Sequence, residues 1–148
     1  MEIKNSQTFN LIKAIKKTNN EILKQESDLV RRYSLTASQY GALECLYLKG
    51  DMHINDLIRR LISTSGTMTV IVRNLEKLGY VTKKLDIEDK RYFNVCLTKE
   101  GKKVVLEILP ERVKQLDDFV NTLDKSEQEM LLNILYKFKA RYKEKDNE

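Results

Sequence analysis

The segment STSGTMTVIVRNLEKLG, residues 63–79, combines small hydroxyl side chains with basic ones. Helical spacing of three and four assigns an inward apolar face to Met68, Ile71, Val72, Leu75 and Leu78. The opposite face carries Ser65, Gly66, Thr69, Val70, Arg73, Asn74 and Lys77. Hydroxyls and the free amides of a helix N-terminus hydrogen-bond phosphates and base edges. This face therefore suits contact with nucleic acid, although the same residues also fit an ordinary Ser/Thr-rich helix start.

A second charged group is DIEDKR, residues 86–91, which lies between two extended runs at 80–85 and 92–97. Arg91 suits the electronegative minor groove of DNA. Asp89 can hold the guanidinium of Arg91 in place, so that less entropy is lost on binding. The alternative is a plain surface ion pair worth ~0–1 kcal/mol.

Other reactive side chains are few. The chain has two cysteines, Cys45 and Cys96, and one histidine, His53, with no CxxC pair. We expect small buried or half-buried thiols, with Cys96 either partly exposed or facing a neighbouring helix, and keep redox sensing by either cysteine as the alternative. His53 falls at a helix cap, as a surface residue or a phosphate contact. No nucleophile with an orienting base is present, so we expect no enzyme, no catalytic residue, no metal and no cofactor.

The amino-acid composition is consistent with a protein that binds polyanions. The 148 residues are 41% hydrophobic and 33% charged, which is typical of one soluble globular domain. Lys and Arg number 27 against 22 acids, a net charge of +5, and a basic excess favours DNA, RNA or anionic lipid as a partner. No apolar run approaches the ~20 residues that span a bilayer, and the N-terminus lacks a signal-peptide core. We expect a cytoplasmic protein with no membrane association.

The elements that must position these residues follow from the apolar pattern. Thr36 and Gln39 form a capping box at the start of one helix. A short helix at 54–61 and the helix after ISTS form a helix-turn-helix. The extended runs then form a hairpin in which Phe93, Val95 and Leu97 face the helices. A helix-turn-helix followed by a hairpin is a winged helix, and DIEDKR is the tip of its wing.

Long helical patterns flank this module. Residues 6–33 and the segment after Asp124 carry apolar stripes that need a partner surface, and an isologous dimer is the commonest solution. Thr98 should cap the helix that follows the hairpin. Pro110 should bend or break that helix.

The runs LTASQYGALECLYLKG, ISTSGTMTVIVRNLEKLGYVTK and DIEDKRYFNVCLTKEG closely resemble the MarR family of bacterial transcriptional regulators. The resemblance covers roughly residues 30–120, with L-T-x-x-Q, L-E-K-x-G-Y, D-x-x-D-x-R and L-T-x-x-G in the family's order. It implies a homodimer on a pseudo-palindromic operator, with Arg91 in the minor groove and Asp89 orienting it. It assigns Ser65, Thr67, Thr69 and Arg73 to the recognition helix. Most members are repressors that a phenolic ligand, an oxidant or a metal releases from DNA.

Shorter motifs indicate which subgroup of the MarR family the sequence resembles. ALECLYLKG and EILPER resemble the quinone- and catechol-responsive regulators. The peroxide-sensing subgroup has a cysteine in the first helix, whereas Cys45 lies in the second, and a single histidine does not fit the zinc sensors.

These inferences give one set of predictions. The fold is mainly α with a small β-hairpin wing, in a single domain of residues 1–148. The winged helix spans about 36–98, and the dimerisation helices span about 6–33 and 99–142. The protein is a DNA-binding repressor with its recognition helix, 65–78, in the major groove, its wing, 86–91, in the minor groove, and a small-molecule effector whose pocket the sequence does not locate. The alternative is a winged-helix protein-interaction module. The predicted DNA contacts are Thr64, Ser65, Thr67, Thr69, Arg73, Asn74, Lys84, Asp89, Lys90 and Arg91.

Overall fold

The computed structural model describes the backbone of residues 6–87 and 92–145, and the side chains as far as residue 138. Three predicted DNA contacts, Asp89, Lys90 and Arg91, lie outside the described residues. By internal contacts the chain divides into two compact units, Met1–Arg112 and Val113–Glu148. Each unit is described by itself.

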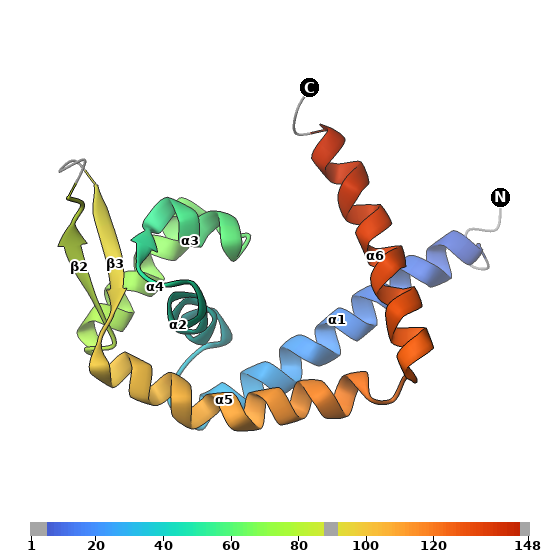
Figure 1. The fold of residues 1–148 in the computed structure, drawn as a ribbon, viewed down its shortest axis with the longest axis horizontal. Coiled ribbons are helices and arrows are strands. Elements are labelled where there is room, and N and C mark those ends of the chain that lie inside the picture. The colour runs from blue at the N-terminus through green and yellow to red at the C-terminus, as the bar shows by residue number, and fades with distance from the viewer. Residues whose placement is uncertain (1–5, 88–91, 146–148) are drawn as a thin grey trace. The chain divides into compact units, whose positions relative to one another are not determined.

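The first unit contains the winged helix (Figure 1). Its elements are α1 (Gln7–Arg31), α2 (Ala37–Lys49), β1 (Met52–His53), α3 (Ile54–Arg60), α4 (Ser65–Lys77), β2 (Val81–Leu85), β3 (Phe93–Leu97) and the first part of α5 (Lys99–Val120). The strands form an antiparallel sheet in the order β1-β3-β2. The second unit holds the end of α5 and α6 (Lys125–Lys145). The predicted fold class is confirmed, and β1 adds a third strand to the predicted hairpin.

Side-chain caps begin several of these helices. The Thr36 hydroxyl accepts the Gln39 amide at 3.2 Å, and the Gln39 side chain accepts the Thr36 amide at 2.8 Å. The predicted capping box of α2 is therefore confirmed. In the second unit Asp124 and Glu127 make the same reciprocal pair, both at 2.9 Å, at the start of α6.

A hydrogen-bonded corner joins the hairpin to α5. The Thr98 hydroxyl donates to the Gly79 carbonyl at 2.7 Å and accepts the Gly101 amide at 3.0 Å, so the predicted cap is confirmed. A Cβ added to Gly101 would lie 2.1 Å from the Tyr80 carbonyl oxygen. Only glycine fits such an approach, which explains the glycine of the L-T-x-x-G motif.

The core of the first unit fixes the orientation of α4. Four residues of its inward face, Met68, Ile71, Val72 and Leu75, are buried as predicted. They join a cluster that includes Leu43, Leu46, Leu57, Val95, Val105 and Ile108. Leu78 was also predicted to face inward, but its side chain is 47% exposed. It follows the last helical residue, where the chain turns through Gly79 at a φ of 75°, so helical periodicity no longer applies.

The hairpin differs from the predicted alternation at two residues. Val95 is buried as expected, but Phe93 is 51% exposed because it pairs with Leu85 at the far end of the ladder. Cys45 is half-buried and Cys96 is buried, as expected for the two thiols, and of the two placements considered for Cys96 partial exposure is wrong. Cys96 lies on the central strand of the sheet, and alternation alone does not reveal which elements cover each face.

Pro110 does not break α5, which runs as one helix from Lys99 to Val120. A proline removes one backbone donor and crowds the preceding turn. The rest of the helix retains its own hydrogen bonds. Of the two predicted effects of Pro110, a bend or a break, the break is therefore wrong.

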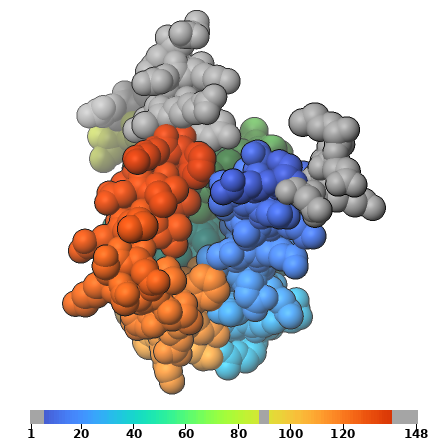
Figure 2. All heavy atoms as spheres, turned by 90° about the vertical axis from the view of Figure 1, so that its right-hand side faces the viewer, coloured from blue at the N-terminus to red at the C-terminus, as the bar shows by residue number. Residues whose placement is uncertain are grey.

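The terminal helices expose apolar side chains. The N-terminal half of α1, blue in Figure 2, lies at the surface with Phe9, Leu11, Ile12 and Ile15 exposed. In the second unit α6 exposes Met130, Leu131, Leu132, Ile134, Leu135, Tyr136 and Phe138. Such density of exposed large apolar residues is typical of surfaces that another chain covers.

Candidate nucleic-acid interface

A short turn sets α4 against α3. Residues 61–64 connect the two helices, and the Ser63 amide donates to the Ile58 carbonyl at 3.0 Å. Ile62 has a φ of 48° and is exposed. Thr64 then caps α4 by accepting the Thr67 amide at 3.2 Å. The predicted helix-turn-helix is present, with α4 as its second helix.

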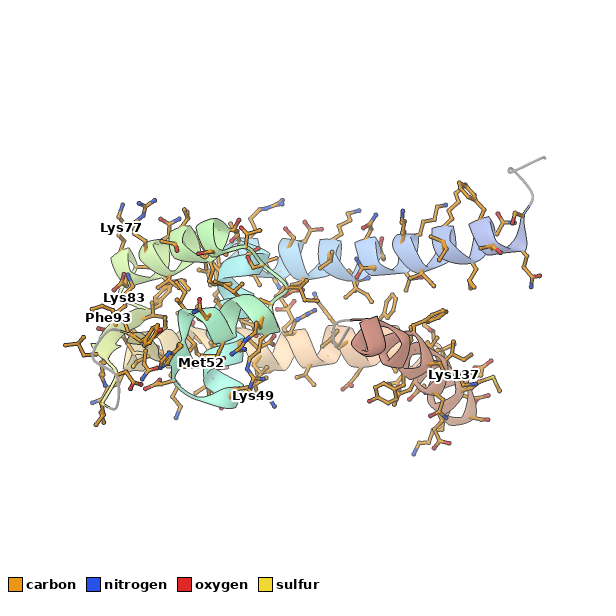
Figure 3. All side chains as sticks on the ribbon, turned by 90° about the horizontal axis from the view of Figure 1, so that it is seen from above. Lys49, Met52, Lys77, Lys83, Phe93 and Lys137 are labelled. Carbon is orange, nitrogen blue, oxygen red and sulfur yellow. The ribbon has the colours of Figure 1, made fainter. Side chains whose placement is uncertain are left out.

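The outward face of α4 carries the predicted contact residues. Ser65, Thr69, Arg73 and Lys77 follow one another at four-residue intervals, and all four are exposed. Thr67 is exposed beside them, and Asn74 is half-buried. Figure 3 shows Lys77 pointing away from the helix into solvent. One exposed stripe of hydroxyl and basic side chains thus runs along the helix.

The hydroxyl groups on and beside this stripe differ in whether they can still donate a hydrogen bond to DNA. The Thr64 hydroxyl donates to the Thr67 hydroxyl at 2.9 Å besides accepting the Thr67 amide, so both of its roles serve the cap. The Thr69 hydroxyl donates to the Ser65 carbonyl at 2.8 Å. A hydroxyl has only one hydrogen to donate. Thr67 therefore remains a donor for a phosphate or base acceptor, while Thr64 is chiefly structural.

The wing starts beside this stripe. Lys84 is exposed on β2. Its neighbour Lys83 forms an ion pair of 2.7 Å with Glu76 of α4. Lys77 and Lys83 lie at the same end of the winged helix (Figure 3). The structure therefore ties β2 to α4 through Lys83, whereas the neighbouring Lys84 points to the other face of the strand, and the tip residues lie outside the described part of the chain.

A polar cluster that was not predicted from the sequence lies at the base of the wing. The His53 Nε2 atom lies 3.0 Å from Oδ2 of Asp86, which also accepts the Asn94 side-chain amide at 2.8 Å. The His53 ring lies 5.5 Å from the Tyr92 ring. Strand pairing places His53 opposite Asn94, and no local sequence motif predicts this pairing.

The two cysteines lie in environments that protect the thiol form. Burial raises the pKa of Cys45, and Arg60 and Lys49 oppose that shift only partly. Burial and a hydrogen bond to Asp51 raise the pKa of Cys96 to about 11. Reactive cysteines have lowered pKa values, because the thiolate is the nucleophile. Among the described residues no group of three or more His, Cys, Asp or Glu could hold a metal ion.

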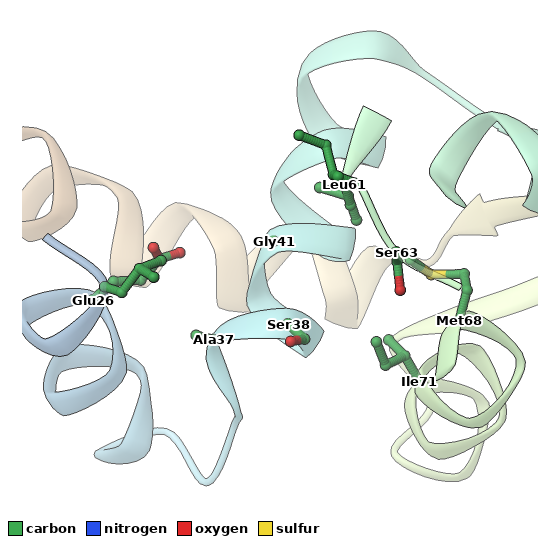
Figure 4. Close-up of a pocket in the computed structure, with 10 residues that line it drawn as sticks. Glu26, Ala37, Ser38, Gly41, Leu61, Ser63, Met68 and Ile71 are labelled. Atoms are coloured by element: carbon green, nitrogen blue, oxygen red, sulfur yellow. The ribbon is translucent and has the colours of Figure 1, made fainter. Parts of the chain in front are cut away.

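A recess of about 310 Å³ opens behind α4 (Figure 4). Its walls come from α1, α2, the α3–α4 turn and the inner side of α4, and are lined by Leu23, Glu26, Ala37, Ser38, Gly41, Leu61, Ile62, Ser63, Met68 and Ile71. Glu26 forms an ion pair of 3.0 Å with Arg112 of α5. Burial raises the pKa of Glu26, while Arg112 lowers it. Sequence reasoning missed this pair because its partners lie on helices far apart in the chain.

No helix in the described part of the chain is both long and apolar enough to cross a membrane.

Comparison with known proteins supports the winged-helix assignment. The model of the MarR family matches residues 35–93. The transcriptional regulator MhqR of Bacillus subtilis is 26% identical over 106 residues, covering 72% of this chain and 73% of that protein. The regulator SarZ of Staphylococcus saprophyticus is 32% identical over 87 residues, covering 59% of this chain and 60% of that protein. These relatives are named as transcriptional regulators of the helix-turn-helix type, not as enzymes.

A solved structure shares the fold. The Staphylococcus aureus MepR–DNA complex superposes with a TM-score of 0.80 at 22% identity, covering 95% of this chain and 99% of that one. The family match falls on the residues that form the helix-turn-helix and the wing, and the likeness in fold extends beyond them. Residues 35–93 thus match the MarR family, and the chain is similar in sequence and in fold to winged helix-turn-helix transcriptional regulators.

Proposed function

We propose that the protein is a homodimeric repressor that binds a pseudo-palindromic operator. The observation that carries the proposal is the exposed stripe of Ser65, Thr69, Arg73 and Lys77 on a helix whose opposite face is locked in the core. A helix held in this way can enter the major groove as a rigid unit. The wing then reaches the adjacent minor groove, where Arg91 sits in an enhanced negative potential.

A dimer supplies the second half of the operator. The exposed apolar residues of α1 and α6 would be covered by the same helices of a second subunit. A twofold dimer presents two copies of α4, so its operator is a pseudo-palindrome with half-sites one helical turn apart, or a multiple of it. A gene-regulatory role is consistent with a cytoplasmic protein that is not an enzyme.

A small neutral phenol fits the recess behind α4 as the releasing signal. The recess is lined mainly by apolar side chains and small residues, and Glu26 supplies a carboxylate on its wall. A carboxylate accepts a hydrogen bond from a phenolic hydroxyl and repels an anion. Because the raised pKa values of Cys45 and Cys96 oppose thiolate chemistry, a bound phenol or hydroquinone accounts for a signal better than thiol oxidation.

The test is selection of bound sites from random duplex DNA, followed by affinity measurements against salt. A repressor of this kind recovers a pseudo-palindrome, and its log affinity falls with log salt at a slope near −0.9 per phosphate neutralised. A winged-helix protein-interaction module, the rival function, would recover no common site. Phenols added to the operator complex should release the DNA, with Glu26→Ala as the variant that resists release.

A further inference from the structure

His53 ties the base of the wing to the helix-turn-helix. It belongs to β1, is the residue just before α3, and pairs with Asn94 of β3. We propose that His53 is a positioning residue for DNA binding, which acts through Asp86 to hold the wing where it meets the operator. This proposal rests on the proposed function and assigns His53 a role through Asp86 rather than through a DNA contact of its own.

The hydrogen bonds at Asp86 define the attachment. Its Oδ2 accepts from Asn94 Nδ2 at 2.8 Å and lies 3.0 Å from His53 Nε2. An ionised carboxylate only accepts, so Nε2 of His53 carries the hydrogen and donates it. The backbone amide of Asp86 donates to the Tyr92 carbonyl at 3.0 Å, which makes this pair the last closed rung described before the tip. Whatever fixes Asp86 therefore fixes the point from which the tip extends.

His53 is itself well placed to act as an anchor. Although it occupies the cap position of α3, its side chain makes no capping hydrogen bond. The ring is inclined at 33° to the Tyr92 ring, so it packs against the hairpin on one side while bonding Asp86. The side chains of His53 and Asp86 are 34% and 18% exposed, and this partial burial reduces competition from water.

A second attachment lies on another helix. Lys83 of β2 bonds Glu76 of α4 at 2.7 Å, which ties the hairpin to the recognition helix. The His53–Asp86 contact ties it to β1 and α3 instead. If one of these two side-chain attachments is lost, the hairpin can rotate more freely relative to the helices. DNA binding must then restrict that motion. Ordering such a segment on binding costs affinity, and a wing fixed beforehand avoids that cost.

The experiment combines protein variants with two DNA lengths. One duplex is the full selected operator, and the other ends before the outer minor grooves that the wings would reach. At one fixed salt, His53→Ala should weaken binding to the full operator about tenfold, since hydrogen bonds to charged groups lie at the strong end of the range. It should leave binding to the short duplex unchanged. His53→Gln should restore most of the affinity, because the glutamine amide can donate in place of Nε2.

Two further measurements separate positioning from direct contact. The double variant His53→Ala with Asp86→Ala should bind no more weakly than Asp86→Ala alone, because residues that act as one unit are not additive. Hydrogen exchange in the free protein should be faster along β2 and β3 in His53→Ala than in the wild type. Asn55→Ala serves as the matched control, because it removes a polar side chain from the hollow that His53 and Tyr92 also line, and it should bind like the wild type.

Several outcomes would overturn the proposal. They are full operator affinity in His53→Ala, an equal loss on both duplexes, additive losses with Asp86→Ala, or unchanged exchange of the hairpin. Failure of the proposed function is distinct, since in that case the wild type itself would not discriminate the operator from random DNA. If only the role proposed for His53 is wrong, the wild type still binds the operator in preference to random DNA.

Discussion

The buried ion pair between α1 and α5 gives a prediction whose magnitude follows from the structure. Glu26 and Arg112 lie 3.0 Å apart, and their side chains are only 12% and 10% exposed, respectively. Within the described residues, Arg112 Nε is also buried without a hydrogen-bond partner. Removing one partner of a buried pair leaves the other charge uncompensated, which costs ~3–5 kcal/mol. We expect Arg112→Ala to lower the free energy of unfolding by about that amount.

The loss of stability in Arg112→Ala should also depend on pH, and the titration of Glu26 determines whether the loss grows or shrinks as pH rises. Burial raises the pKa of Glu26 and Arg112 lowers it, so the variant raises that pKa further. A carboxyl whose folded-state pKa lies above its unfolded value stabilises the fold when protonated. That stabilisation is lost as pH rises through the folded-state pKa. Arg112→Ala should therefore be more destabilising at about pH 8 than at about pH 5.

Urea unfolding followed by circular dichroism measures both effects, at one protein concentration because dimerisation contributes to stability. The matched control is Arg32→Ala, which removes an arginine from the Arg32–Glu111 pair near the same two helices, with side chains 55% and 43% exposed. It should change stability little, since solvent screens such a pair. Glu26→Gln in the Arg112→Ala background should abolish the extra pH dependence. Equal losses for the two arginine variants, or a loss independent of pH, would refute the reasoning.

Three other predictions concern DNA binding and assembly. Arg73→Ala should relax preference at one base position by ~1–3 kcal/mol if the guanidinium reads a guanine edge; uniform weakening across sequences in a binding-site selection would make it a phosphate contact instead. Replacing Cys45 and Cys96 by Ala should leave operator affinity under reducing conditions nearly unchanged, and a large loss would contradict their protected thiol state. Deleting residues 1–20 removes the exposed Phe9, Leu11, Ile12 and Ile15 but none of the buried core, so sedimentation should show loss of the dimer while the winged helix stays folded; an unchanged dimer would refute this role of α1.

Local sequence determines the features that were predicted correctly. The caps at Thr36 and Thr98 depend on residues three positions apart, so the sequence contains both partners of each bond. The inner face of α4 follows from a strong helical period, and the hairpin from two extended runs around a polar tip. These signals need no knowledge of distant elements.

The features that were missed depend on contacts between distant segments. The His53–Asp86 bond spans 33 residues and exists because β1 pairs with β3. The Glu26–Arg112 pair requires α1 to lie against α5. Cys96 is buried because its strand is central, which alternation within one strand cannot show. Phe93 and Leu78 deviate because they lie at the ends of their elements, where a regular period no longer predicts burial.

The position of α4 joins the two proposed activities of the protein. Met68 and Ile71 line the recess, while Thr69 and Arg73 lie on the exposed side of the same helix. Because its inner face is packed in the core, a shift of the inner residues carries the outer residues with it. A phenol in the recess weakens operator binding only if it binds the free form more tightly than the DNA-bound form. The coupling must then be reciprocal, so that operator DNA weakens phenol binding by the same factor. Titrating phenol into the protein with and without operator measures that factor, and equal phenol affinity in both titrations would exclude the recess as the site of the signal.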